Sequence, residues 1–175
     1  PYGTLPPRQR RALHKLAAEW LLEMGGARAG EHMLLVAEHF EQAGEPALAA
    51  EQLRRAGEHA TRVAAHEEAL TILLRARELV GAREHRAARF EVDLSLGELH
   101  SHNGRLDEGR RLLEALVLEA REAENTRVLA RALGLLGRFA LWQDDRPASL
   151  RYLEEALSLT RSLGDERGLV FILRQ

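Results

Sequence analysis

Eight histidines are spread through this 175-residue sequence, and histidine is a frequent general base and metal ligand. His100 and His102 stand two positions apart, a spacing that places them on different faces of a helix. The metalloprotease pattern His-Glu-x-x-His does not occur. His39, His59 and His66 each adjoin a glutamate, so salt bridging or solvation explains them better than ligation. We therefore expect no metal site.

Hydroxyl and carboxylate groups are plentiful, but their spacing does not suggest catalysis. Ser95, Ser101 and Thr71 have no histidine or aspartate at a spacing that identifies a catalytic partner. The carboxylates alternate with arginine at helical spacing, which is typical of solvated helix faces. No Gly-x-x-x-x-Gly-Lys-Ser/Thr phosphate loop occurs. We expect no enzyme activity and no cofactor.

The composition indicates an all-α protein. Apolar residues make up 45% and charged residues 30% of the chain, with alanine, leucine, glutamate and arginine dominant. The net charge of −2 argues against nucleic acid or an anionic membrane as a partner. No apolar run is long enough for a membrane helix. The absence of cysteine fits a reducing compartment, and we expect a cytoplasmic fragment of a longer protein.

The first predicted helix opens after Pro6-Pro7, at about Arg8. Its apolar face is expected from helical spacing to comprise Leu13, Leu16, Ala17, Trp20 and Leu21. Its start is basic, with Arg8, Arg10, Arg11 and Lys15. A solvated face is the simpler interpretation, and a phosphate-binding arm is the alternative. Binding of DNA through this helix is disfavoured by the net charge.

Residues recur forty positions apart in the second half of the chain. Leu136-Gly137 repeats Leu96-Gly97, and Tyr152-Leu153-Glu154 repeats Leu112-Leu113-Glu114. Such a period is typical of stacked helical hairpins. Earlier, the set Ala49, Leu53 and Ala56 recurs after twenty residues as Ala69, Leu73 and Ala76. We therefore expect the period to lengthen after Arg83.

Turn and cap residues divide the chain into helices. The predicted helices start at about residue 8 and then cover 31–43, 47–64, 67–80, 84–103, 107–123, 126–142 and 147–163, with a last one from 166. Caps are expected at Asn103-Gly104, Asn125-Thr126, Asp144-Asp145 and Gly164-Asp165. The loops are short, so successive helices should be antiparallel neighbours. We divide the chain into an N-terminal helix and linker (1–30), first repeat-like helices (31–81), two hairpins (82–125 and 126–165) and the first helix of a further repeat (166–175).

The pattern of small and large residues resembles the tetratricopeptide repeat (TPR). It reads Leu96-Gly97…Gly104…Gly109…Leu113, then Leu136-Gly137…Asp144…Leu153…Ala156, with a first copy at Ala37…Phe40…Gly44…Ala49…Leu53…Ala56. Small residues let helices approach closely, and leucine or phenylalanine fills the space between them. The resemblance implies a right-handed α-solenoid of antiparallel hairpins with about eight to nine helices.

A narrower resemblance covers the first third of the chain. The order of residues here is similar to the segment after the ATPase core in multidomain bacterial signal-transduction ATPases and class III nucleotide cyclases. It reads Tyr2-x-x-Leu5…Arg10-Arg11-x-Leu13-His14…Ala17-Ala18-Glu19-Trp20, then Ala37-Glu38-His39-Phe40-x-x-Ala-Gly-x-Pro46…Ala50…Leu53-Arg-Arg-Ala-Gly57-Glu58. It implies a regulatory helical array in a larger bacterial signalling or transcriptional regulator. The alternative is a ligand-sensing or autoinhibitory array that acts on an upstream ATPase or cyclase domain.

In such arrays the first helix of each hairpin lines the concave groove, where partners bind. The residues expected there are Glu91, Glu98, His102, Arg131, Arg138 and Trp142. Trp142 is the best candidate anchor, since tryptophan and arginine are enriched in binding hot spots. Packing of Trp142 between repeats is the alternative. The expected partner is a protein, a peptide or the upstream domains of the same protein.

The last predicted helix contains a five-residue apolar run, 169–173, which is too wide for one helix face against one neighbour. Leu169, Phe171 and Ile172 are the candidate edge residues. We expect them to pack against a second copy of the chain or against a further repeat.

Overall fold

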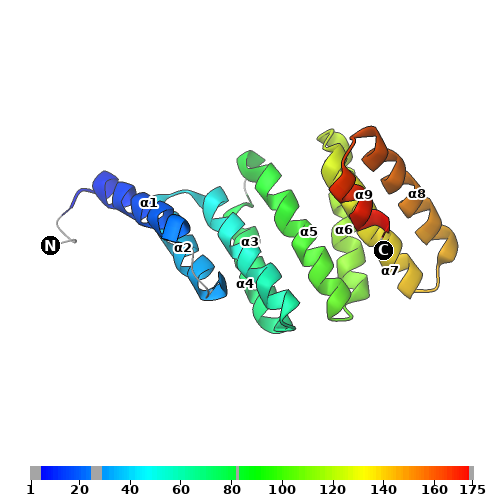
Figure 1. Ribbon diagram of the computed structural model, residues 1–175, viewed down its shortest axis with the longest axis horizontal. Coiled ribbons are helices and arrows are strands. Elements are labelled where there is room, and N and C mark those ends of the chain that lie inside the picture. Colours follow the sequence, from blue (N-terminus) through cyan, green and yellow to red (C-terminus); the bar gives the residue numbers. More distant parts are fainter. Residues whose placement is uncertain (1–4, 25–28, 82, 174–175) are drawn as a thin grey trace. The chain divides into compact units, whose positions relative to one another are not determined.

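The computed structural model describes residues 5–24, 29–81 and 83–173, and in these ranges the chain is helical without strands. The helices are α1 (Pro7–Met24), α2 (Ala29–Ala43), α3 (Pro46–Arg62), α4 (His66–Leu79), the short 3-10 turn η2 (Arg83–His85), α5 (Arg86–His102), α6 (Leu106–Glu122), α7 (Thr126–Trp142), α8 (Arg146–Ser162) and α9 (Glu166–Leu173) (Figure 1). This architecture of antiparallel helical hairpins confirms the predicted all-α fold class. None of the helices in the described ranges combines the length and apolar character needed to cross a bilayer.

The helices α3 to α9 begin at intervals of twenty residues, at Pro46, His66, Arg86, Leu106, Thr126, Arg146 and Glu166. A left-handed backbone conformation occurs at Gly44, Ala64, Gly104, Glu124, Asp144 and Gly164. The prediction that the period lengthens after Arg83 is therefore wrong. One helix with its turn takes twenty residues both before and after Arg83, and a hairpin takes forty.

Three of the four predicted caps form as expected. The side-chain oxygens of Asn125, Asp145 and Asp165 accept the backbone N–H groups of Val128, Ala148 and Gly168, at 3.1, 3.0 and 3.0 Å. Asn103 is different, because its Oδ1 accepts the N–H of Arg105 inside the turn, at 3.3 Å. Arg105 is itself the N-cap residue of α6 and provides no side-chain cap.

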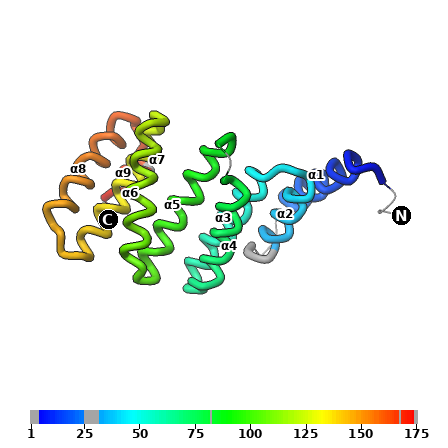
Figure 2. The backbone as a smooth tube through the Cα atoms, turned by 180° about the vertical axis from the view of Figure 1, so that it is seen from behind, coloured from blue at the N-terminus to red at the C-terminus, as the bar shows by residue number. Residues whose placement is uncertain are grey.

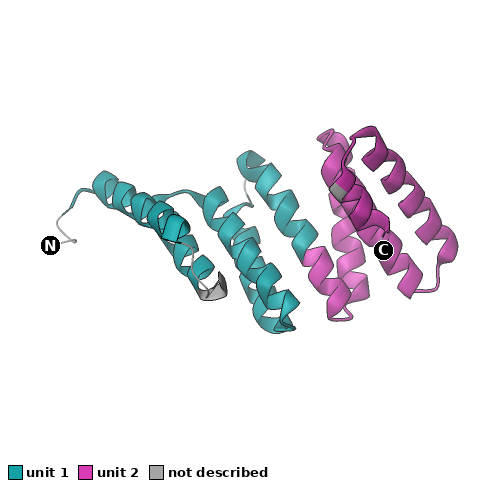
Figure 3. Cartoon of the chain, viewed as in Figure 1, with its two compact units in different colours: residues 1–95 teal, residues 96–175 magenta. Residues whose placement is uncertain are grey.

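The chain divides into two compact units, residues 1–95 and residues 96–175, with the boundary inside α5 (Figure 3). In the first unit, α1 packs on α2, α2 on α3, and α3 on α4. Ala18, Val36, Phe40 and Ala49 form a buried cluster there, flanked by Leu21 and Leu79.

The predicted apolar face of α1 is only partly correct. Leu13, Leu16 and Trp20 remain 48%, 61% and 58% exposed, whereas Ala18 is fully buried. The side of α1 that packs on α2 is centred on Ala18 and Leu21, about a third of a turn from the expected face. Helical spacing identifies an apolar stripe, but it does not identify the neighbour that covers it.

In the second unit, α7 is the central helix and packs against α6, α8 and α9. Its buried residues therefore surround its axis, including Val128, Leu133, Leu136, Phe139 and Ala140. The short α9 lies along α7 (Figure 2).

Close glycine–leucine contacts identify the equivalent hairpins. A Cβ atom added to Gly57, Gly97 or Gly137 would lie 2.6–2.7 Å from the side chain of Leu73, Leu113 or Leu153, respectively. These three glycines are forty residues apart, and each is in the first helix of its hairpin. The repeat copy preceding Gly97 is therefore α3–α4. The sequence match at Ala37–Ala56 places it one helix too early.

Candidate interaction surface

The six residues expected to bind a partner lie on two helices. Glu91 is on the part of α5 that belongs to the first unit. The others are in the second unit: Glu98 and His102 on α5, and Arg131, Arg138 and Trp142 on α7. His102 and Trp142 are exposed and the other four are partly buried. The structure brings three of the six together, namely Glu98, Arg138 and Trp142.

Arg138 is the centre of this group, which also includes Ser101. The Arg138 guanidinium donates through Nη2 to Ser101 Oγ at 2.8 Å. Ser101 Oγ in turn donates to the backbone carbonyl of Glu98 at 2.5 Å. The Cζ atom of Arg138 lies 5.5 Å from the ring centroid of Trp142, a cation–π distance. The serine and the indole therefore fix the position of the guanidinium.

The Trp142 side chain contacts Phe139 and remains about half exposed to solvent. Its ring meets Phe139 edge-on, with 6.2 Å between the centroids, and Phe139 is fully buried. Trp142 itself is 48% exposed. It is thus not enclosed as a core residue, and its ring offers an apolar surface beside a cation.

The charge of Arg138 is poorly compensated. Among the described residues it makes no ion pair, and its Nε is buried without a hydrogen-bond partner. Burial lowers the pKa of Arg138, and the negative charge of Glu98 opposes that shift. A desolvated cation without a counter-charge is costly, and an anion that reaches the guanidinium from outside would offset its charge.

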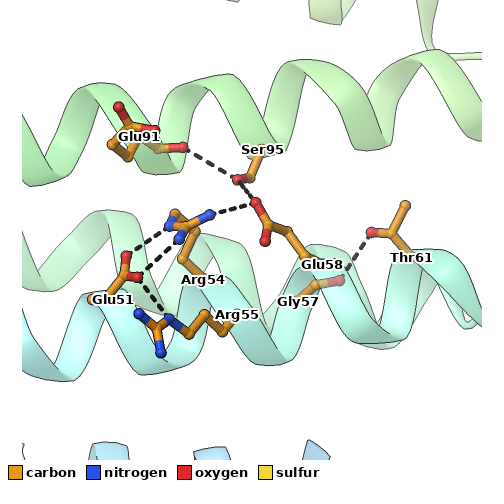
Figure 4. A network of polar contacts seen from close by, with 8 residues as sticks. All are labelled: Glu51, Arg54, Arg55, Gly57, Glu58, Thr61, Glu91 and Ser95. Atoms are coloured by element: carbon orange, nitrogen blue, oxygen red, sulfur yellow. Dashed lines mark hydrogen bonds and ion pairs between the residues drawn. The ribbon is translucent and has the colours of Figure 1, made fainter. Parts of the chain in front are cut away.

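The equivalent position in the first unit is compensated (Figure 4). Eighty residues before Arg138, at the same register on α3, stands Glu58, which forms an ion pair with Arg54. Arg54 also binds Glu51 with 2.8 Å between Nε and Oε2, and Ser95 Oγ donates to Glu58 at 2.9 Å. Arg55 completes the network through a 2.7 Å ion pair with Glu51.

The ion pairs of this network shift the pKa values of Arg54 and Glu51 towards their charged forms. Burial alone would lower the pKa of Arg54, but its bonds to Glu51 and Glu58 outweigh burial and raise it. Burial would raise the pKa of Glu51, but Arg54 and Arg55 lower it. On this face of α3 the charged side chains therefore neutralise one another in ion pairs.

On α7 the repeat keeps these positions but reverses their charge. Arg131 and Arg138 stand where α3 has Glu51 and Glu58, and Gly134 stands where α3 has Arg54. Gly134 instead accommodates the Ile172 side chain of α9. The helix α7 thus has two arginines where α3 has two glutamates. The arginine that pairs with Glu58 on α3 is replaced by Gly134 on α7, which has no side chain to pair with Arg138.

The sequence did not identify Ser101, Glu51, Arg54, Glu58 and Ser95 as members of polar clusters. In the sequence, Ser95 and Ser101 are candidates only as nucleophiles. The forty-residue register from Gly57 to Gly97 and Gly137 would have aligned Glu58, Glu98 and Arg138 and revealed the reversal of charge. The bond between Arg138 and Ser101 joins different helices, so local spacing does not predict it.

Within the described ranges, no three histidine, aspartate or glutamate side chains gather in a way that could hold a metal ion. His100 is buried and His102 is exposed, so this pair does not converge.

The C-terminal candidates are in α9. Ile172 is 5% exposed because it packs at Gly134, and Leu169 and Phe171 are partly buried. Val170 and Leu173, at 49% and 69%, are the exposed apolar residues of this helix.

Known structures share this fold. Two crystal structures of a Podosopora anserina protein, described as a kinesin light chain with nearly identical TPR-like repeats, are 15% identical to this chain, with TM-scores of 0.54 and 0.53. The matches cover 90% and 92% of this chain, and 97% and 99% of those chains. No family model and no curated protein matches the sequence. At this identity the likeness concerns the fold, and the chain is a TPR-like array of helical hairpins.

Proposed function

We propose that the chain is a non-catalytic module that binds a protein or peptide segment through the exposed side of α5 and α7 in the second unit. The observation that carries this proposal is the guanidinium of Arg138, which has no ion pair among the described residues, beside the half-exposed ring of Trp142. Arginine and tryptophan dominate binding energy where they are held in place before the partner arrives.

The chemistry of the group specifies the partner. The guanidinium of Arg138 suits a carboxylate, because charge-assisted hydrogen bonds between these two groups are among the strongest in proteins. Trp142 suits an apolar side chain one or two residues away from that carboxylate. The partner is therefore a segment with an acidic residue, or a terminal carboxylate, next to an apolar one.

Selection from a random peptide display library against the intact chain tests this proposal. Selected peptides are expected to be enriched in aspartate or glutamate next to an apolar residue. Their binding can be followed by fluorescence in a Trp20→Phe variant, in which Trp142 is the remaining tryptophan. Quenching or a spectral shift on titration places the peptide at Trp142.

Two arginine substitutions provide the decisive comparison. Arg138→Gln should weaken binding by about tenfold or more, since a charge-assisted hydrogen bond is lost. Arg151→Gln removes the same charge from an exposed position on α8 and should leave affinity unchanged. Equal effects of the two substitutions, or selected peptides without acidic residues, would contradict the proposal.

We also propose a biological setting, supported by the resemblance of the first third of the chain to a segment of bacterial signal-transduction ATPases and cyclases. The module would act in the cytoplasm as part of a larger signalling or transcriptional regulator. In the alternative form, the segment recognised by Arg138 belongs to an upstream ATPase or cyclase domain, which the array senses or inhibits. Addition of the isolated array to such a domain from the same polypeptide separates the two, because only the alternative predicts altered nucleotide turnover.

A further proposal concerns association of two copies through the C-terminal edge. Val170 and Leu173 are exposed neighbours of the buried Ile172, so this end of the second unit offers an apolar strip to another chain.

A further inference from the structure

A cavity in the first unit lies between the start of α1 and the end of α2. Its volume is about 300 Å³, and its lining comprises Pro7, Arg10, Arg11, His14 and Gln42. Three of these side chains are basic, one is an amide, and none is acidic. Basic residues at the start of α1, which are not part of the proposed interaction surface, therefore line this cavity.

The two arginines of this cavity differ from the nearby basic residue. Lys15 is bound to Glu45, with 2.6 Å between Nζ and Oε1. Among the described residues, Arg10 and Arg11 make no ion pair, although Arg10 is partly buried. Two arginines therefore line the cavity without an ion pair to a described carboxylate.

His14 adds a third group with an unusual contact. Its Nδ1 lies 2.8 Å from Nδ1 of His39 on α2, so one ring donates and the other accepts. Two protonated rings would set N–H against N–H at this distance. Burial lowers the pKa of His14, and the charges of His39 and Arg10 lower it further. The surroundings are electropositive, and an anion in the cavity would offset that potential.

We propose that this cavity binds the phosphate group of a small phosphomonoester through Arg10, Arg11 and His14. The charge favours a phosphate over a carboxylate, because two guanidiniums match a dianion and each can bind two oxygens. The volume favours a small molecule, since it lies at the lower end of the range for ligand pockets. This site is in a different unit from Arg138 and is independent of the proposed peptide site.

Calorimetric titration of the full 175-residue chain with glycerol phosphate, inorganic phosphate and acetate tests the ligand class. Saturable millimolar binding is expected for the two phosphates, with at least about tenfold weaker binding of acetate. Equal binding of acetate, or no saturation by either phosphate, would overturn the proposal.

Variants on α1 test the location. The double variant Arg10→Gln, Arg11→Gln should weaken binding of glycerol phosphate by about tenfold or more. Arg8→Gln is the matched control, because Arg8 is exposed on the same helix and does not line the cavity. Its affinity should stay within about twofold of the parent. An equal loss in Arg8→Gln would show unspecific attraction to a basic helix and would overturn the site.

The histidine ring resonances provide a readout independent of affinity. Saturating glycerol phosphate should shift those of His14 and His39 and leave that of His100, in the other unit, in place. Unchanged His14 and His39 resonances at saturation would place the ligand elsewhere.

Discussion

His100 is a buried histidine whose Nδ1 has no hydrogen-bond partner. Burial lowers the pKa of His100 from its ordinary value of 6.5, while Glu108 raises it and Arg105 lowers it. The folded chain therefore holds the ring neutral at a pH where the unfolded chain would protonate it.

This arrangement predicts a loss of stability in acid. The unfolded state binds more protons once the pH falls below about 6.5, so the contribution of His100 is present above that pH and is lost below it. Thermal unfolding of the parent between pH 7.5 and pH 5 should show a larger drop in Tm than that of His100→Gln. Since other carboxyl and histidine groups are common to both chains, parallel curves for the two would contradict the prediction.

At the scale of the element, the contacts of Gly57, Gly97 and Gly137 with leucine set the distance between paired helices. A Cβ atom at these positions meets the leucine side chain at less than 3 Å, so the leucine must shift or the paired helices must separate. Gly137→Ala, and equally the change to alanine at Gly57 or Gly97, should lower the free energy of unfolding by about 1–3 kcal/mol. Urea denaturation measures this difference.

Gly81→Ala is the control for these variants. A Cβ atom there would have only ordinary contacts, at 3.5 Å from the carbonyl oxygen of Glu78 and 3.9 Å from that of Arg77. Gly81→Ala should unfold at nearly the same urea concentration as the parent. If it lost as much stability as Gly137→Ala, helix proximity would not be the cause.

Helix caps offer a second prediction at this scale. Asp145→Ala removes the acceptor for the Ala148 N–H and should cost about 1 kcal/mol. Ala65 occupies the corresponding N-cap position of α4 without a side-chain cap. Ala65→Asp should therefore stabilise the chain by a similar amount, and a loss of stability would show that this turn cannot admit the cap.

Helix boundaries follow from the sequence because their signals are local. The predicted helix 126–142 coincides with α7, and 147–163 is one residue from α8, since Asn125 and Asp145 cap the first turns directly. The register between helices is harder to predict from the sequence. The equivalence of Gly57 with Gly97 depends on contacts with Leu73 and Leu113, which lie sixteen residues away.

The same distinction applies to the candidate surface. Arg138 and Trp142 are four residues apart on one helix, so their contact follows from helical spacing. Ser101 lies thirty-seven residues from Arg138 and joins the group only through packing of α5 with α7. The cavity at Arg10 likewise depends on how α2 is placed beside α1, which the basic sequence alone does not reveal.

For the whole molecule, the proposed association through α9 predicts a concentration-dependent mass. Light scattering should show the parent growing heavier with concentration, and the double variant Val170→Glu, Leu173→Glu staying monomeric. Leu150→Glu is the control, since Leu150 is 60% exposed on α8. A parent of constant mass, or a control as monomeric as the double variant, would contradict association through α9.

The forty-residue spacing of the glycine–leucine contacts has a consequence for genetic recombination. Residues 97–136 begin and end at equivalent points of successive hairpins, so a second copy inserted after Leu136 rejoins the chain at Gly137 without a change of phase. Because hairpins of this kind contact mainly their neighbours, each added copy contributes its own interface. The duplicated chain should fold and need more urea to unfold, whereas an insert shortened by three residues should unfold more easily than the parent. Unequal crossing-over between such equivalent points of the gene would thus lengthen the protein by a whole hairpin.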